Sequence, residues 1–133
     1  MKYAVYLDGK IIGKTNLELG DPPMGVAFGN IRFSNIPSPY EFFRDYCQKN
    51  NVSISTEDAD LKMIMTGHIP GLKVLNNTDI EIKGVGGAYI EGMEQEFTVN
   101  ILGIEYPFYG EEFPEHCKAY ENQFKEKRSK DHL

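Results

Sequence analysis

The sequence has few cysteines, fewer basic than acidic residues, and no long apolar run. Its 133 residues include two cysteines, and 14 Lys and Arg stand against 20 Asp and Glu, for a net charge of −6. The deficit of basic residues argues against nucleic-acid binding, which needs a clustered Lys/Arg surface. No apolar run approaches the roughly 20 residues of a membrane-spanning helix, so we expect no membrane association. A single domain of this size buries roughly two thirds of the surface of its unfolded chain and needs no disulfide.

Signals for export and for bound groups are missing as well. The chain reaches Asp8-Gly9 before a secretory apolar segment could form, so we expect a cytoplasmic protein with reduced thiols at Cys47 and Cys117. Zinc ligands usually come in pairs such as Cys-x2-Cys or His-x3-His, and neither pair occurs. The glycine-rich run at 84–87 lacks the Gly-Lys-Ser/Thr of a phosphate loop, which favours a turn between strands. We therefore expect neither a metal ion nor a cofactor.

A cysteine nucleophile is not favoured either. Cys47 lies on the apolar stripe of an expected helix, where a buried and inert thiol is the ordinary finding. Cys117 neighbours His116 in the sequence, but adjacent helical residues point about 100° apart and do not face each other. The sequence thus favours a protein that is not an enzyme.

The strongest local signals predict a hairpin and a helix. Apolar and polar side chains alternate on both sides of Asp8-Gly9, a dipeptide that the type I′ hairpin turn prefers. Ser38 is a good N-cap, Pro39 fits the first helical position, and Glu41 completes a capping box. The apolar stripe that follows predicts a helix that ends at residues 50–51.

Other segments give weaker signals. Strands are expected at 26–33 and 97–101 and on both sides of a turn within 72–82. Gly29 is interpreted as a bulge or a point of close approach. The two prolines within residues 19–25 are expected to break regular structure there. The pattern of residues 52–71 fits either a short helix that starts at 56–58 or a strand at 61–65. Residues 104–109 are expected to form an edge strand or an irregular segment, because they contain Pro107.

A second helix is expected after Pro114, because Cys117, Tyr120 and Phe124 recur there at helical spacing. The polar tail at 129–133 is expected to fray. No repeat, linker or low-complexity segment divides the chain. The sequence therefore predicts one α+β domain over residues 1–128, with a mainly antiparallel sheet of about six or seven strands and two helices.

Two features suggest binding surfaces. Residues 84–117 contain seven Glu and no Lys or Arg, which either forms a negative surface that steers a basic partner or simply keeps the protein solvated. The loop at 20–25 is stiffened by two prolines, and it either presents Asp21 and Met24 to a ligand or forms a rigid corner.

The runs Tyr6 to Lys10 and Gly20 to Ala27, together with Ile101 to Ile104 and Phe113 to His116, resemble a group of small uncharacterised bacterial cytoplasmic proteins. Some members of this group are encoded near secreted toxins and are suspected to be immunity proteins. The resemblance implies a protein-binding role and carries no catalytic motif.

We therefore expect a non-enzymatic domain that binds a basic protein partner, as a bacterial immunity protein would bind a basic effector. The acidic surface for this partner is predicted to comprise Glu91, Glu94, Glu96 and Glu105, with Tyr89 and Tyr106 as aromatic anchors. The alternative is a small enzyme or ligand-binding domain whose cleft is bordered by the two prolines and contains Asp21, Met24, His68 and His116. A third possibility is a subunit of a homo-oligomer, joined through a strand edge or the aromatic C-terminal helix.

Overall fold

The chain begins with the hairpin that Asp8-Gly9 predicts. In the computed structural model, which describes residues 1–131, β1 (Tyr3–Leu7) pairs antiparallel with β2 (Lys10–Thr15). Asp8 and Gly9 have φ angles of 50° and 81°. These are the positive values that a type I′ turn requires, so the prediction is confirmed.

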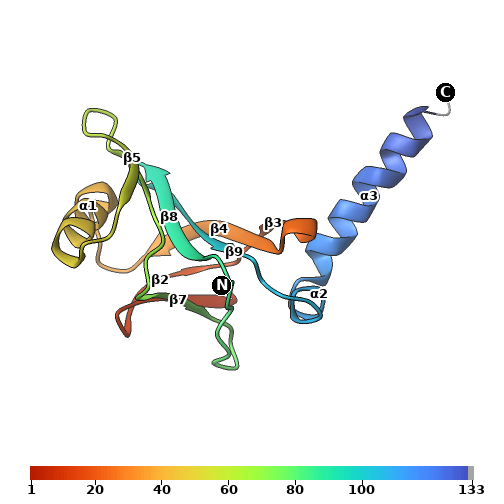
Figure 1. Ribbon diagram of the computed structural model, residues 1–133, viewed down its shortest axis with the longest axis horizontal. Helices are drawn as coiled ribbons and strands as arrows, with labels where there is room; N and C mark the ends of the chain where they lie inside the picture. Colours follow the sequence, from red (N-terminus) through yellow and green to blue (C-terminus); the bar gives the residue numbers. More distant parts are fainter. Residues whose placement is uncertain (132–133) are drawn as a thin grey trace.

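The remaining strands extend this hairpin into one bent antiparallel sheet (Figure 1), in the order β5-β6-β8-β9-β4-β2-β1-β7, with β3 paired to β4. They are β3 (Leu19–Asp21), β4 (Val26–Phe33), β5 (Ile54–Asp58), β6 (Met63–Thr66), β7 (Leu72–Leu75), β8 (Gly87–Met93) and β9 (Glu96–Leu102). The α+β class and the antiparallel sheet are as predicted, with a somewhat higher strand count. Among the described residues there are also three helices rather than two, of which two are substantial.

Strand β4 joins the two halves of the sheet. It pairs with β9 along one edge, while the other edge pairs first with β3 and then with β2. Gly29 lies where the partner changes, and a Cβ there would be only 2.6 Å from Thr15 Oγ1 and 2.7 Å from the Leu17 nitrogen. Glycine is therefore required by a close approach of backbone, which is one of the two interpretations of Gly29 from the sequence.

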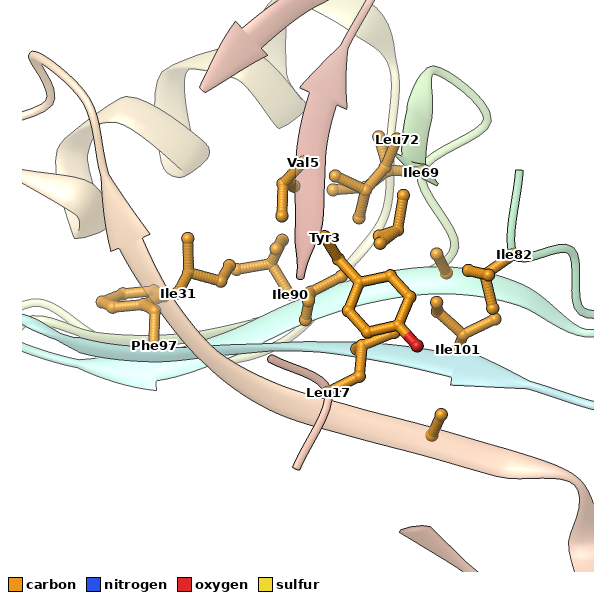
Figure 2. Packing of buried hydrophobic residues seen from close by; sticks show 14 of the residues in the cluster. Tyr3, Val5, Leu17, Ile31, Ile69, Leu72, Ile82, Ile90, Phe97 and Ile101 are labelled. Carbon is orange, nitrogen blue, oxygen red and sulfur yellow. The ribbon is translucent and has the colours of Figure 1, made fainter. Parts of the chain in front are cut away.

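The core fills the space between the two halves of the bent sheet (Figure 2). Val5 from β1, Ile90 from β8 and Ile101 from β9 are at most 1% exposed. Each such side chain contributes roughly 1.5–3 kcal/mol through its removal from water. The buried Thr66 hydroxyl accepts a hydrogen bond from the Ile90 nitrogen at 3.1 Å, so this polar group within the core is satisfied.

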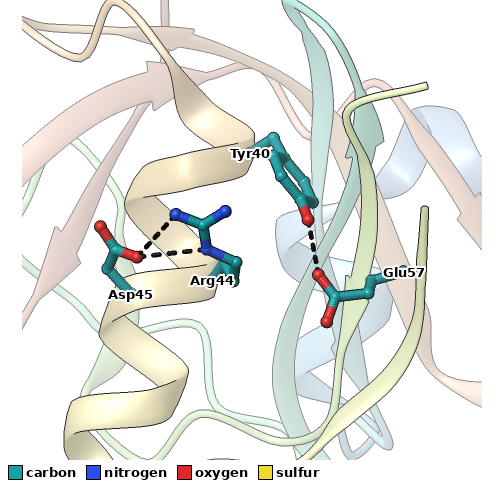
Figure 3. A network of polar contacts seen from close by, with 4 residues as sticks. All are labelled: Tyr40, Arg44, Asp45 and Glu57. Atoms are coloured by element: carbon teal, nitrogen blue, oxygen red, sulfur yellow. Dashed lines mark hydrogen bonds and ion pairs between the residues drawn. The ribbon is translucent and has the colours of Figure 1, made fainter. Parts of the chain in front are cut away.

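Helix α1 (Pro39–Asn50) closes one end of the core, and Phe43 is its fully buried residue. The Phe43 ring stacks on Phe97 of β9 with centroids 6.1 Å apart. The helix has the predicted bounds, although the Ser38 side chain makes no capping hydrogen bond. Figure 3 shows polar contacts of this helix: the Tyr40 hydroxyl donates to Glu57 of β5 at 2.6 Å, and Arg44 pairs with Asp45.

The other end of the domain carries α2 (Phe108–Glu112) and α3 (Pro114–Asp131). Only the first turns of α3 lie against the sheet, and the helix then projects away from it (Figure 1). It continues to Asp131, so residues 129–131 of the expected tail are helical. The last two residues of that tail, 132–133, lie outside the described residues.

Several local expectations are corrected or resolved. Residues 19–25 are regular: they form β3 and the short 3-10 helix η1 (Pro22–Met24), because β4 supplies a partner strand. Residues 56–58 belong to β5, which decides the open segment in favour of strands. Residues 104–109 are irregular and then enter α2, while the expected strand around Ile82 is reduced to one isolated bridge.

Candidate protein-binding surface

One face of the β6-β8-β9 part of the sheet points away from the core. Along β8, Ala88 and Ile90 are buried, so the alternating Tyr89, Glu91 and Met93 face outward. Strand register aligns further residues with them: Met93 lies opposite both Met63 and Glu96, and Glu91 lies opposite Met65 and Thr98. The surface formed in this way is called the outer face, and it consists of Met63, Met65, Tyr89, Glu91, Met93, Glu96 and Thr98.

The outer face contains an apolar hollow of about 330 Å³ between β5, β6 and β8. Met63, Met65 and Met93 line it, with Glu91 at its border. Met93 is 47% exposed, and it shares the hollow with Met63 and Met65 rather than standing alone on the surface. Unbranched thioether side chains adapt their shape to a partner, which makes methionine common on protein-binding surfaces.

One carboxylate, Glu91, lines this hollow, and two more lie near it. Glu91 and Glu96 belong to the outer face, and Glu94 lies in the tight turn between β8 and β9 with a φ of 57°. None of these three joins an ion pair with a side chain of residues 1–125. Burial and then the nearby Glu91 carboxylate raise the pKa of the Tyr89 phenol, so this side chain stays a neutral donor. The face therefore combines apolar area, an aromatic ring and carboxylates that form no ion pair, with Lys62 in the turn beside Glu94.

The structure groups four of the six predicted partner-binding residues and separates two. Glu91, Glu94, Glu96 and Tyr89 lie on or beside the outer face. Glu105 instead lines a depression near α2 with Lys83 and Phe108. Tyr106 is also near α2, where its hydroxyl donates to the Pro22 carbonyl at 2.8 Å. The seven glutamates of residues 84–117 thus do not form one continuous surface.

The residues of the alternative ligand site converge only in part. Asp21 and His116 line one cleft of about 600 Å³ between β3 and α3. His68 lines a different and smaller hollow with Pro70 and Gly87. Met24 is 67% exposed on η1 and lines neither. The four residues therefore do not share one cleft.

His116 is held by hydrogen bonds on both ring nitrogens. Its Nε2 lies 2.8 Å from the Leu17 carbonyl, and because a carbonyl only accepts, Nε2 carries a proton. The Tyr109 hydroxyl lies 2.9 Å from both His116 Nδ1 and the Val26 carbonyl. A Cβ on Gly20 would overlap the Tyr109 hydroxyl, so this glycine makes the close contact possible. The network fastens α3 to the corner formed by β3 and β4.

The protonation of His116 is governed by its surroundings. Burial lowers the pKa of the imidazole, although the Leu17 carbonyl and the Glu18 carboxylate both favour its charged form. Burial also raises the pKa of the Tyr109 phenol, which remains protonated. These shifts have structural causes within a buried network, and the ring nitrogens are already occupied. We therefore assign His116 to the attachment of α3.

The structure also places the two cysteines and the residue types that could bind a metal ion. Cys47 is 1% exposed, and burial raises the pKa of its thiol, the opposite of what a nucleophile needs. Both cysteines are free thiols, and Cys117 is only partly buried. Within residues 1–131, no three His, Cys, Asp or Glu side chains are grouped so that they could hold a metal ion.

The protein was compared with family models, curated proteins and solved structures. None of them matches. Within residues 1–131, no helix combines the length and the apolar composition needed to cross a membrane.

Sequence reasoning missed the methionines of the outer face. Met63 and Met65 are two residues apart, and this spacing places both on one side of a strand. The signal was present, but segment 52–71 stayed open between helix and strand, so it could not be used. Met93 joins them only through cross-strand pairing with Met63, which local sequence does not encode.

Proposed function

We propose that this protein is a non-enzymatic binding domain that uses the outer face to bind a basic protein. The observation that supports this most directly is the apolar hollow of Met63, Met65 and Met93 with Glu91 at its border. An interface of this kind gains affinity from its apolar centre, while charges at its rim steer the partner and speed association. A complementary partner presents an apolar anchor flanked by Lys or Arg.

Tyr89 suits the role of an anchor within this surface. It lies on the same side of β8 as Glu91, and its Cα is opposite that of Asn100 in β9. Tyrosine gives a large contact area with little loss of conformational freedom, and it is enriched among residues that dominate binding energy. The resemblance of the sequence to suspected immunity proteins suggests a secreted basic effector as the partner class.

A capture experiment tests this proposal. The wild-type protein and the variant Glu91→Lys/Glu94→Lys/Glu96→Lys are immobilised and exposed to lysate of cells that carry the chain. The wild type is expected to retain a basic protein that salt elutes, because exposed charges are screened at high ionic strength. The triple variant is expected to lose at least about 90% of that protein, since reversed charges repel it.

The matched control reverses three exposed carboxylates away from the outer face: Glu105→Lys/Glu111→Lys/Glu121→Lys. This variant has the same change in net charge, so it is expected to retain the basic protein as the wild type does. Equal retention by the outer-face variant, loss by both variants, or no basic protein on the wild type would each contradict the proposal. Circular dichroism of all three proteins verifies that they are folded.

A further inference from the structure

The projecting helix α3 carries an aromatic pair that the domain does not cover. The Tyr120 and Phe124 rings pack edge to face with centroids 4.9 Å apart, and Phe124 is still 48% exposed. The helix is 18 residues long, about 27 Å. Figure 1 shows its C-terminal half clear of the sheet. A helix segment without tertiary contacts is only marginally stable in water, so this part of α3 lacks the packing that normally holds a helix.

Beside α3 lies the cleft of about 600 Å³ already described, here called the α3 groove. Its apolar part comprises Leu19 and Phe28 of the sheet and Ala119 and Tyr120 of the helix. Leu19 is 51% exposed. The groove thus presents apolar side chains next to the exposed aromatic pair. Groove and pair are both apolar, so each is suited to pack against the other.

Acidic residues outnumber basic ones around the groove. Glu18, Asp21 and Glu115 line it, and of these Glu115 pairs with Lys118 of the same helix at 3.7 Å. An adjoining depression adds Glu111 and Glu112 together with Lys2. The sequence after Phe124 has the opposite sign, since residues 125–131 hold four basic and two acidic residues. The C-terminal half of α3 therefore complements the groove in charge, although it cannot fold back into the groove of its own chain.

We infer that the α3 groove receives the C-terminal half of α3 from a second copy of this chain. The two helices run antiparallel, so each copy gives its helix and offers its groove, as an isologous two-fold interface requires. Phe124 of one copy enters beside Tyr120, Leu19 and Phe28 of the other. The segment after Phe124, which is basic in sequence, then runs toward Asp21 and Glu115 of the other copy. This inference concerns a surface other than the outer face and does not rest on the proposed function.

Sedimentation equilibrium across a dilution series tests the first part. The wild type is expected to approach twice the monomer mass of 15.1 kDa. Phe124→Ser is expected to raise the dimer dissociation constant at least about tenfold. The control Val85→Ser removes an apolar side chain that is 80% exposed elsewhere, and it should leave the dissociation constant unchanged. A wild type that stays monomeric at every concentration overturns the inference.

A charge exchange tests the helix-in-groove arrangement itself. One variant carries Lys125→Glu and Lys127→Glu on the helix, and the other carries Asp21→Lys and Glu115→Lys in the groove. Each alone is expected to be monomeric, because helix and groove then have the same sign. An equimolar mixture is expected to regain the dimer, because each helix meets a groove of opposite sign. The arrangement is overturned if the helix variant and the groove variant are each still dimeric when measured alone, or if their mixture remains monomeric.

Discussion

At the scale of single residues, His116 shows how a residue suited to catalysis serves a structural purpose. Both ring nitrogens are engaged, by the Leu17 carbonyl and the Tyr109 hydroxyl, and Phe113 stacks on the ring with centroids 4.7 Å apart. The sequence placed His116 beside Cys117 but gave no sign of these partners, since Leu17 is 99 residues away. Contacts of that separation depend on the completed fold.

The lowered pKa of His116 makes stability depend on pH. In the unfolded chain, the His116 imidazole takes up a proton as the pH falls below its ordinary pKa of about 6.5, whereas in the folded protein burial opposes this protonation. The free energy of unfolding therefore decreases as the pH falls through that window. We expect the urea midpoint to decrease between about pH 7.5 and about pH 5.5, and to decrease less in His116→Gln. The control His68→Gln makes the same replacement at an exposed histidine outside the His116 network. The same dependence in His116→Gln would contradict the assignment.

At the scale of elements, prediction succeeded where the signal was local. Asp8-Gly9 defines its turn through backbone angles that these residues adopt readily, and Pro39 marks the start of α1 for a similar reason. Prediction failed at β3 because the two prolines of η1 obscure a short hairpin between β3 and the Val26–Phe28 part of β4. The strands β5 and β6 stayed open for another reason, since β6 pairs with the remote β8. Short elements stabilised by remote partners leave little trace in the local sequence.

The attachment of α1 gives a prediction at this scale. Phe43 is fully buried and contacts Phe33, Phe42 and Phe97. We expect Phe43→Ala to lower the free energy of unfolding by about 3–5 kcal/mol, because it removes buried area and leaves a cavity. Phe42→Ala, at a partly buried neighbour on the same helix, should cost clearly less. Urea denaturation compares the two, and equal costs would show that α1 is not held mainly through Phe43.

At the scale of the whole molecule, the net charge of −6 is a poor guide to where charge acts. The outer face contains Glu91 and Glu96, with Glu94 in the adjacent turn, whereas Glu105, Glu111 and Glu115 lie toward the α2 and α3 end. The sequence predicted an acidic segment but could not divide it, because a strand places its neighbours on opposite sides and the chain then leaves the sheet after Leu102. The candidate surface was thus predictable in sign and in part of its membership, and its methionines were not.

Two separate surfaces imply two separable activities. The outer face is formed by β6, β8 and β9, while the α3 groove is formed by β3, β4 and α3, and the two share none of their defining residues. Effects at sites without shared contacts usually add, so we expect Glu91→Lys/Glu94→Lys/Glu96→Lys to sediment like the wild type. Phe124→Ser should in turn retain the captured basic protein as the wild type does. Loss of the captured protein in Phe124→Ser would mean that binding needs the dimer, and altered mass in the charge-reversed variant would mean that the outer face contributes to self-association.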